Sequence, residues 1–284
     1  MALQLGLFVN PSVDRYRETL AIVDAAERGG LDLIGIQDHP YQRRFLDTFA
    51  LIGDLLARTD RLTFFPDVAN LPLRPPAALA KQSASLDLMS GGRFELGLGA
   101  GALWDRVATM GVPRRSPGES VEALEEAITI LRAGWRGDET MNFDGRYYAL
   151  EGWEPGPPPA HPIGIWLGSY KPRMLRLTGR AADGWIPSLG RMDADAMSEA
   201  RKVIDEAAEK AGRDPAEVLG LCNVSGELTD GERGEGVLDG PPEHWVETLR
   251  GLSERLGLGA IILPAQSVEQ VERLVNEVAP GLRS

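Results

Sequence analysis

The sequence predicts an α/β protein, a closed (β/α)8 TIM barrel formed as one domain by residues 1–284. Short apolar runs alternate with longer amphipathic runs, which indicates parallel strands covered by helices. Eight such strand–helix units can be counted, and eight in one domain favours a closed barrel over an open sheet. The composition, 43% hydrophobic and 25% charged, is that of an ordinary globular protein.

The first half of the chain supplies four units. Apolar runs predict strands at 3–9, 33–37, 62–69 and 94–98. Amphipathic runs predict helices at 15–28, 48–58, 75–89 and 120–135. The third helix opens with Pro75, where a missing N–H costs least, and Gly91 and Gly92 end it. Residues 104–117 contain glycine and two prolines and are expected to form a loop.

After the fourth helix, residues 138–162 interrupt the rhythm, and we interpret them as a short insertion. Phe143–Tyr147 resembles a hairpin turn, and residues 155–162 are proline-rich and predict an extended linker. The alternation then resumes. Strands are expected at 163–167, 184–187, 218–224 and 260–263. Helices are expected at 172–182, 194–211, 242–256 and 268–278.

Charge and cysteine content exclude several classes of function. The net charge is -12, and an acidic surface repels phosphate backbones and anionic lipids, so we expect no nucleic-acid or membrane partner. The single cysteine, Cys222, cannot form an internal disulfide, which fits a reducing cytoplasm. The N-terminus lacks a basic leader, so we expect no signal peptide. The three histidines are far apart, so no metal site is predicted.

Residues that follow the predicted strands are the candidates for chemistry, because barrels of this kind carry active sites at the C-terminal strand ends. Asp38 and His39 follow the second strand, and Pro40 holds His39 extended. This pair indicates either a ligand site with His39 as a donor or proton relay, or a loop turn with a capping Asp. Asn70 follows the third strand, as a turn residue or as a hydrogen-bond partner of a ring edge.

Glycine-rich segments follow the fourth and fifth strands. Residues 97–102 let the backbone approach a ligand and match a dinucleotide fingerprint, weakly, since that motif belongs at the first strand of an open sheet. Gly168 and Ser169 precede a helix and predict either a phosphate-binding loop or a simple N-cap by Ser169. After the sixth strand, Arg191 adds a cation near this rim or is a solvated surface charge.

Aromatic residues near the expected rim predict a substrate pocket. Tyr41 lies just after Asp38 and His39, and Trp104 lies in the expected loop after the fourth strand. An aromatic side chain at such a position lines a pocket or simply packs.

Two segments resemble signatures of the luciferase-like monooxygenase superfamily, namely SGGRFELGLG at 90–99 and GRAADGW at 179–185. The similarity runs over nearly the whole chain. Asp38 and His39 resemble the pair found in the branch that uses the 8-hydroxy-5-deazaflavin coenzyme (coenzyme F-420). The resemblance implies a hydride-transferring oxidoreductase that acts on a small organic substrate. Since this family is often dimeric, it also implies a homodimer.

The resemblance also implies a site. Catalysis would rest on His39 and Asp38, and the ring would lie against a non-proline cis peptide at Asp67–Val68. The residues that would contact the coenzyme are Asp38, His39, Asp67, Val68, Asn70, Ala100, Gly101, Gly168, Ser169 and Arg191. Some deazaflavin dehydrogenases carry a glutamate where this chain has Ala102. Proton transfer would therefore rest on His39 or on water.

Three other functions stay open at this point. An FMN-dependent monooxygenase would use reduced flavin and oxygen on the same scaffold. A non-catalytic barrel would bind flavin without turnover, and the missing acid at Ala102 permits this alternative. A metal-dependent barrel hydrolase is the third, and the lack of clustered histidines argues against it.

Overall fold

The computed structural model describes residues 3–137 and 139–283. Its main sheet is parallel and has the strand order β3-β2-β1-β11-β10-β9-β8-β5-β4. The strands are β1 (Gln4–Val9), β2 (Leu33–Ile36), β3 (Thr63–Pro66), β4 (Ala69–Asn70), β5 (Leu96–Gly99), β8 (Ile165–Leu167), β9 (Gly184–Trp185), β10 (Leu219–Asn223) and β11 (Leu258–Pro264). A parallel bridge between Phe64 and Phe94 joins β3 to the β5 side and closes the barrel. The predicted barrel is confirmed.

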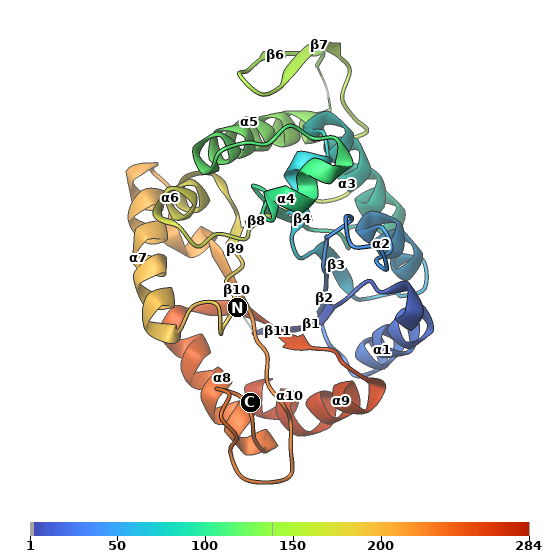
Figure 1. Ribbon diagram of the computed structural model, residues 1–284, viewed down its shortest axis with the longest axis vertical. Coiled ribbons are helices and arrows are strands. Elements are labelled where there is room, and N and C mark those ends of the chain that lie inside the picture. Colours follow the sequence, from blue (N-terminus) through green and yellow to red (C-terminus); the bar gives the residue numbers. More distant parts are fainter. Residues whose placement is uncertain (1–2, 138, 284) are drawn as a thin grey trace.

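Helices surround the strands on the outside (Figure 1). They are α1 (Tyr16–Arg28), α2 (Thr48–Leu56), α3 (Pro76–Ser90), α4 (Trp104–Val107), α5 (Pro117–Arg136), α6 (Pro172–Ala181), α7 (Ala194–Lys210), α8 (Pro242–Leu256), α9 (Val268–Arg273) and α10 (Ala279–Arg283). A π-helical segment at Leu274–Val278 connects α9 to α10, so the helix expected at 268–278 is longer and irregular.

Two sequence predictions about the third and fourth units were wrong. The strand expected at 62–69 is divided, because Asp67 and Val68 leave the ladder and Ala69–Asn70 pairs with β5 instead. The loop expected at 104–117 contains α4, and α5 begins at Pro117. The cause of the early start is a capping box, in which Ser116 accepts from the Glu119 N–H (3.3 Å) and Glu119 accepts from the Ser116 N–H (2.8 Å).

The inserted segment forms the predicted hairpin, β6 (Met141–Asp144) with β7 (Ala149–Trp153), while its first residue, 138, lies outside the described residues. The hairpin lies outside the barrel beside α5 (Figure 1). Glu126 of α5 accepts hydrogen bonds from the backbone N–H groups of Arg146, Tyr147 and Tyr148 at 2.8–3.1 Å. The single carboxylate of Glu126 thus ties the turn to the helix.

The barrel interior holds an apolar cluster separate from the larger core between strands and helices. Its members are Leu33, Phe65, Trp166, Ile186, Leu221, Ala260 and Ile262. Phe65 and Trp166 meet edge to face, with ring centroids 5.1 Å apart. Side chains alternate along a strand, so the residue two positions beyond each member points into the barrel nearer to its C-terminal mouth.

The two segments that resemble family signatures, 90–99 and 179–185, make hydrogen bonds between helices and strands. Arg93 donates hydrogen bonds to the carbonyl oxygens of Leu56 and Leu62, each at 3.0 Å. Asp183 accepts from the Ile165 N–H at 2.8 Å and pairs with Arg132 at 3.0 Å. These contacts join helices to strand starts and therefore stabilise the fold.

The crossing of α6 and α7 gives a stability prediction. A Cβ added at Gly179 would lie 2.1 Å from the Ile204 carbonyl oxygen, a backbone atom that cannot move away cheaply. We expect Gly179→Ala to lower the free energy of unfolding by about 1–3 kcal/mol through overpacking.

The matched control is Gly251 in α8, where an added Cβ meets nothing within 4 Å. We expect Gly251→Ala to stabilise the protein by about 0.5–1 kcal/mol, because alanine loses less backbone entropy on folding. Urea unfolding of both variants measures the two effects. Equal effects at the two positions would contradict this account of the crossing.

Candidate active site

A ring of polar side chains lies directly above the apolar interior, at the C-terminal strand ends. These residues, called the mouth layer below, are Asn10, Gln37, Asp67, Ser188 and Asn223. Asp67, Ser188 and Asn223 come two positions after members of the interior cluster, Asn10 comes two positions after Phe8, which packs against the cluster, and Gln37 comes four positions after Leu33. Asn223 donates from Nδ2 to Asp67 Oδ1 at 3.2 Å, which joins β10 to β3 across the barrel. Except for Asp67, these residues were not predicted from the sequence, and an even-numbered step along the strand from the interior residues is the signal that finds them.

Three residues of the mouth layer, Asn10, Ser188 and Asn223, line a cleft of about 420 Å³. The lining residues are Phe8, Asn10, Arg15, Ser188, Leu189, Asn223, Val224, Ser225, Pro264, Ala265 and Gln266. A cavity of this volume with a few polar groups on an apolar wall has the character of a small-molecule site.

The Asp67–Val68 peptide is cis, as the resemblance implied. Val68 packs against the interior cluster and covers two glycines of neighbouring strands. A Cβ at Gly99 would lie 2.9 Å from Val68 Cγ2, and one at Gly168 would lie 3.1 Å from the same atom. Glycine at both positions therefore makes room for the backbone bulge that the cis peptide forms at Val68. This packing accounts for a glycine at position 168 without a role in phosphate binding.

Asp38 is fully buried and already has its partners. Arg74 donates to it from Nε (3.0 Å) and Nη2 (2.7 Å), and the Asn70 N–H donates at 2.8 Å. Arg74 also stacks over Phe49 at 4.2 Å and reaches Asp47 at 3.0 Å.

The resemblance implies that Asp38 is catalytic and faces the ring, and these contacts show how its carboxylate is held. Both of its oxygens accept hydrogen bonds, and through Oδ2 Asp38 positions the Asn70 backbone. Arg74 was not found from the sequence, because nothing in its local pattern marks a buried cation.

His39 is half-buried in the loop after β2, and its Nδ1 is hydrogen-bonded to the Tyr41 hydroxyl. Burial lowers the pKa of His39 below its ordinary 6.5, and the nearby Asp38 carboxylate opposes this shift only in part. The imidazole is therefore neutral at pH 7 and able to accept a proton. Burial raises the pKa of Tyr41, so its hydroxyl stays protonated.

Three buried side-chain oxygens near the mouth have no hydrogen-bond partner among the described residues: Asp67 Oδ2, Asn70 Oδ1 and Asn223 Oδ1. Burial raises the pKa of Asp67 to about 7, and the hydrogen bond from Asn223 offsets this only in part. Buried polar atoms without a partner are costly, and since Asp67 and Asn223 are hydrogen-bonded to each other, two of these oxygens lie close together where a bound group would complete their hydrogen bonds.

The phosphate loop predicted at Gly168 and Ser169 has a different local structure. The Ser169 hydroxyl is buried and hydrogen-bonded to Thr178 at 2.9 Å. Lys171 precedes α6 without a side-chain cap, so the alternative of an N-cap by Ser169 is wrong. Ser169 can reach a phosphate only through its backbone. The exposed Arg191 stacks over Tyr170 at 4.1 Å.

Residues 100–104 cross in front of the loop that follows Asn70. Gly101 has a φ of 100°, and a Cβ there would lie 2.6 Å from Pro72 and 3.2 Å from Trp104. Ala100 is partly buried against the core. The glycines at 97 and 99 lie within β5 and no helix follows them directly, so the dinucleotide fingerprint is not supported. Asp105 does not replace the missing acid, since it is exposed and paired with Arg114.

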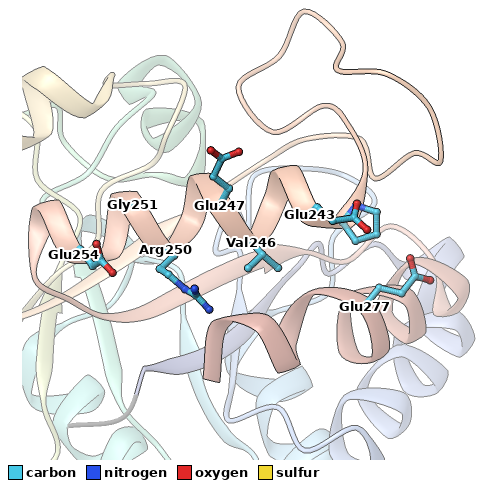
Figure 2. Close-up of a pocket in the computed structure, with 8 residues that line it drawn as sticks. Glu243, Val246, Glu247, Arg250, Gly251, Glu254 and Glu277 are labelled. Atoms are coloured by element: carbon cyan, nitrogen blue, oxygen red, sulfur yellow. The ribbon is translucent and has the colours of Figure 1, made fainter. Parts of the chain in front are cut away.

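A second cavity, of about 480 Å³, lies on the outer surface of α8 (Figure 2). Its lining is mainly acidic, with Glu243, Glu247 and Glu254 from α8 and Glu277 from the C-terminal segment. The predicted site residues line neither this cavity nor the mouth cleft, but Asn223 of the mouth cleft is hydrogen-bonded to Asp67, so the mouth cleft is the candidate active site. Within residues 3–137 and 139–283, no group of three or more His, Cys, Asp or Glu side chains could hold a metal ion, and no helix is long and apolar enough to cross a membrane.

Comparison of this sequence with known proteins identifies its family and several relatives. Residues 3–225 match the family model for luciferase-like monooxygenases. An F420-dependent glucose-6-phosphate dehydrogenase of Gordonia bronchialis is 34% identical over 75% of this chain and 66% of its own length. A protein of the same name from Microbacterium testaceum is 30% identical over 70% of this chain and 60% of its own length. The matched region thus spans slightly less than two thirds of these relatives.

Solved structures share the fold at low identity. An F420-dependent secondary alcohol dehydrogenase with an F420-acetone adduct has a TM-score of 0.88 and 18% identity over all of both chains. The F420-dependent tetrahydromethanopterin reductase of Methanopyrus kandleri has a TM-score of 0.86 and 17% identity, over 99% of this chain and all of its own.

Proposed function

Because this chain belongs to the luciferase-like monooxygenase family, we propose that it is an oxidoreductase that moves a hydride between a deazaflavin coenzyme and a small organic substrate. The observation that carries the proposal is the group of buried, unpartnered oxygens of Asp67, Asn70 and Asn223 beside the Val68 bulge. Such a wall has one apolar face and several free polar atoms, which suits a flat heteroaromatic ring. The names of the relatives at 30–34% identity support the choice of deazaflavin.

In the proposal, different residues of this chain bind different parts of the coenzyme. In the proposal, Val68 backs the ring, and the three unpartnered side chains bind its polar edge. Ala100 and Gly101 line one side, while the backbone of Gly168 and Ser169 and the side chain of Arg191 approach the phosphate. When bound, the coenzyme supplies the ring carbon that accepts or gives the hydride.

His39 would carry the proton chemistry. Oxidation of an alcohol to a carbonyl releases a hydride and the hydroxyl proton, so the proton needs an acceptor near the substrate. The neutral imidazole of His39 meets this need, and Tyr41 fixes the orientation of the imidazole by its hydrogen bond to Nδ1. Tyr41 and Trp104 would border the substrate.

We extend the proposal to the cellular setting. An acidic chain with one buried cysteine fits the cytoplasm, and we expect a homodimer. Exposed Leu88 (41%) and Met89 (76%) at the end of α3 are apolar residues that a second copy would cover. Light scattering of the purified protein measures the oligomeric state.

A binding titration tests the coenzyme. Purified protein is titrated with oxidised deazaflavin coenzyme and, separately, with FMN, and binding is followed by ligand fluorescence. We expect deazaflavin to bind at least ten times more tightly. Tighter FMN binding would instead support the monooxygenase, and binding without turnover of any alcohol tested would support a non-catalytic flavin-binding barrel. If neither ligand binds, the proposed function is wrong.

A further inference from the structure

We propose that Asp67 is a protonated carboxylic acid in the working site, whose Oδ2–H donates a hydrogen bond to an acceptor on the edge of the bound ring, so that coenzyme binding requires this one side chain to be neutral. The inference rests on the proposed function, since it assigns a role toward the deazaflavin. It adds a hydrogen-bond donor to a site where the Asp38 carboxylate is paired with Arg74.

The position of the carboxyl comes first. Asp67 follows Phe65 by two residues and therefore points into the barrel. A Cβ added at Gly35 of the neighbouring strand β2 would lie 3.0 Å from Asp67 Oδ2, so this oxygen lies against the barrel wall. Asp67 exposes only 9% of its surface. Its Oδ1 is held by Asn223, which leaves Oδ2 as the buried oxygen without a hydrogen-bond partner.

The surroundings of Asp67 offer no compensating cation. Among the described residues, its side chain is hydrogen-bonded to the neutral amide of Asn223, and no described Lys, Arg or His lies within ion-pair distance. A buried carboxylate without a cation is costly, whereas a buried neutral acid costs far less. This is the physical reason that its pKa is raised from 3.8 to about 7.

The titratable groups on the elements around Asp67 do not change this balance. Tyr170, after β8, is hydrogen-bonded to Ser188 at 3.0 Å, and its pKa is raised chiefly by burial. Cys222 on β10 has its pKa raised to about 12 by burial and is neutral. After β2, Asp38 is paired with Arg74 and His39 is neutral. Toward solvent, Arg191 stacks over Tyr170 and Arg15 lines the cleft.

A neutral Asp67 gives the mouth a mixed hydrogen-bonding pattern. Oδ2–H is a donor, while Asn70 Oδ1 and Asn223 Oδ1 are acceptors without partners. The pyrimidine edge of a flavin-type ring carries carbonyl oxygens beside an imide N–H, which is the complementary pattern. An ionised Asp67 would present only acceptors and would repel the same carbonyl oxygens.

The test compares wild type with Asp67→Asn, whose amide keeps a donor and cannot ionise. Dissociation constants for oxidised deazaflavin are measured from pH 5.5 to 9. Ionisation of the coenzyme affects both proteins equally, so the ratio of the two constants is the readout. We expect the wild-type constant to rise relative to the variant above pH 7, by about tenfold per pH unit.

Two further measurements, thermal unfolding of the free protein and calorimetry of coenzyme binding, complete the design. In the free protein, the raised pKa of Asp67 contributes to folding stability. This contribution is fully present below pH 3.8, the ordinary pKa, and is lost as the pH rises through the folded-state pKa of about 7. The Tm of wild type should therefore fall relative to that of Asp67→Asn between pH 4.5 and 7.5. If the variant fails to fold, calorimetry of wild type in two buffers of different ionisation enthalpy should show uptake of about one proton per coenzyme at pH 8 and none at pH 6.

The outcomes separate the two proposals. Wild type that binds no deazaflavin at pH 6 refutes the proposed function itself. Wild type that binds, with a ratio of constants independent of pH or with no proton uptake at pH 8, overturns the role of Asp67 and leaves the proposed function standing.

Discussion

Asp38→Ala is expected to lower the free energy of unfolding by about 3–5 kcal/mol, because it leaves the Arg74 guanidinium and the Asn70 N–H without their buried acceptor. The Arg74 side chain is only 12% exposed, so water cannot replace the carboxylate. Urea or thermal unfolding measures the effect, and we expect Tm to fall by roughly 6–15 °C.

Asp47→Ala is the matched control, since Asp47 contacts the same guanidinium at 3.0 Å but its side chain is 47% exposed. It also accepts the Ala50 N–H as the N-cap of α2. We expect a loss of only about 0.5–2 kcal/mol, typical of a helix cap. A loss at Asp38 no larger than that at Asp47 would show that the buried pair does not hold the mouth in place.

His39→Ala is expected to lower kcat/KM for alcohol oxidation by about 10²–10⁴-fold, the usual contribution of a positioned general base. The side chain is half-buried in a loop, so Tm should change by no more than a few degrees. Steady-state kinetics beside a thermal melt measures both quantities. Loss of folding without a separate kinetic defect would show that His39 is not the general base.

Tyr41→Phe serves as the control for His39, because it keeps the imidazole and removes only its hydrogen-bond partner. We expect a decrease in kcat/KM of about tenfold or less, since only orientation is lost. The pH profile adds a second readout. The pKa of His39 is lowered, so in wild type the rate should fall only below pH 6.5, where the imidazole becomes protonated.

Much of the frame could be predicted because its signals are local. The alternation of apolar and amphipathic runs gave eight units, and the parallel barrel confirms them. The segments at 90–99 and 179–185 identify the family, and their side chains, such as Arg93 and Asp183, bind neighbouring strand starts and helix ends. Such contacts depend on residue type at one place, so a short stretch of sequence reveals them.

The candidate site was predictable in part. The cis peptide at Asp67–Val68 was implied by resemblance and is present, and Val68 packs beside Gly99 and Gly168. The capping box that starts α5 early was also readable from Ser116 and Glu119, and was overlooked.

By itself, then, the sequence determined the barrel, the family and the bulge, because periodicity and short motifs act over neighbouring residues. Only the tertiary structure decided which polar groups are free. Asp38 and Asp67 both follow a strand and look alike in sequence, yet Arg74 pairs with the first, and the second is buried without a cation. Asn223 joins Asp67 from 156 positions away. The charge state of a carboxyl depends on burial and on distant partners, and closure of the barrel is what brings those partners together.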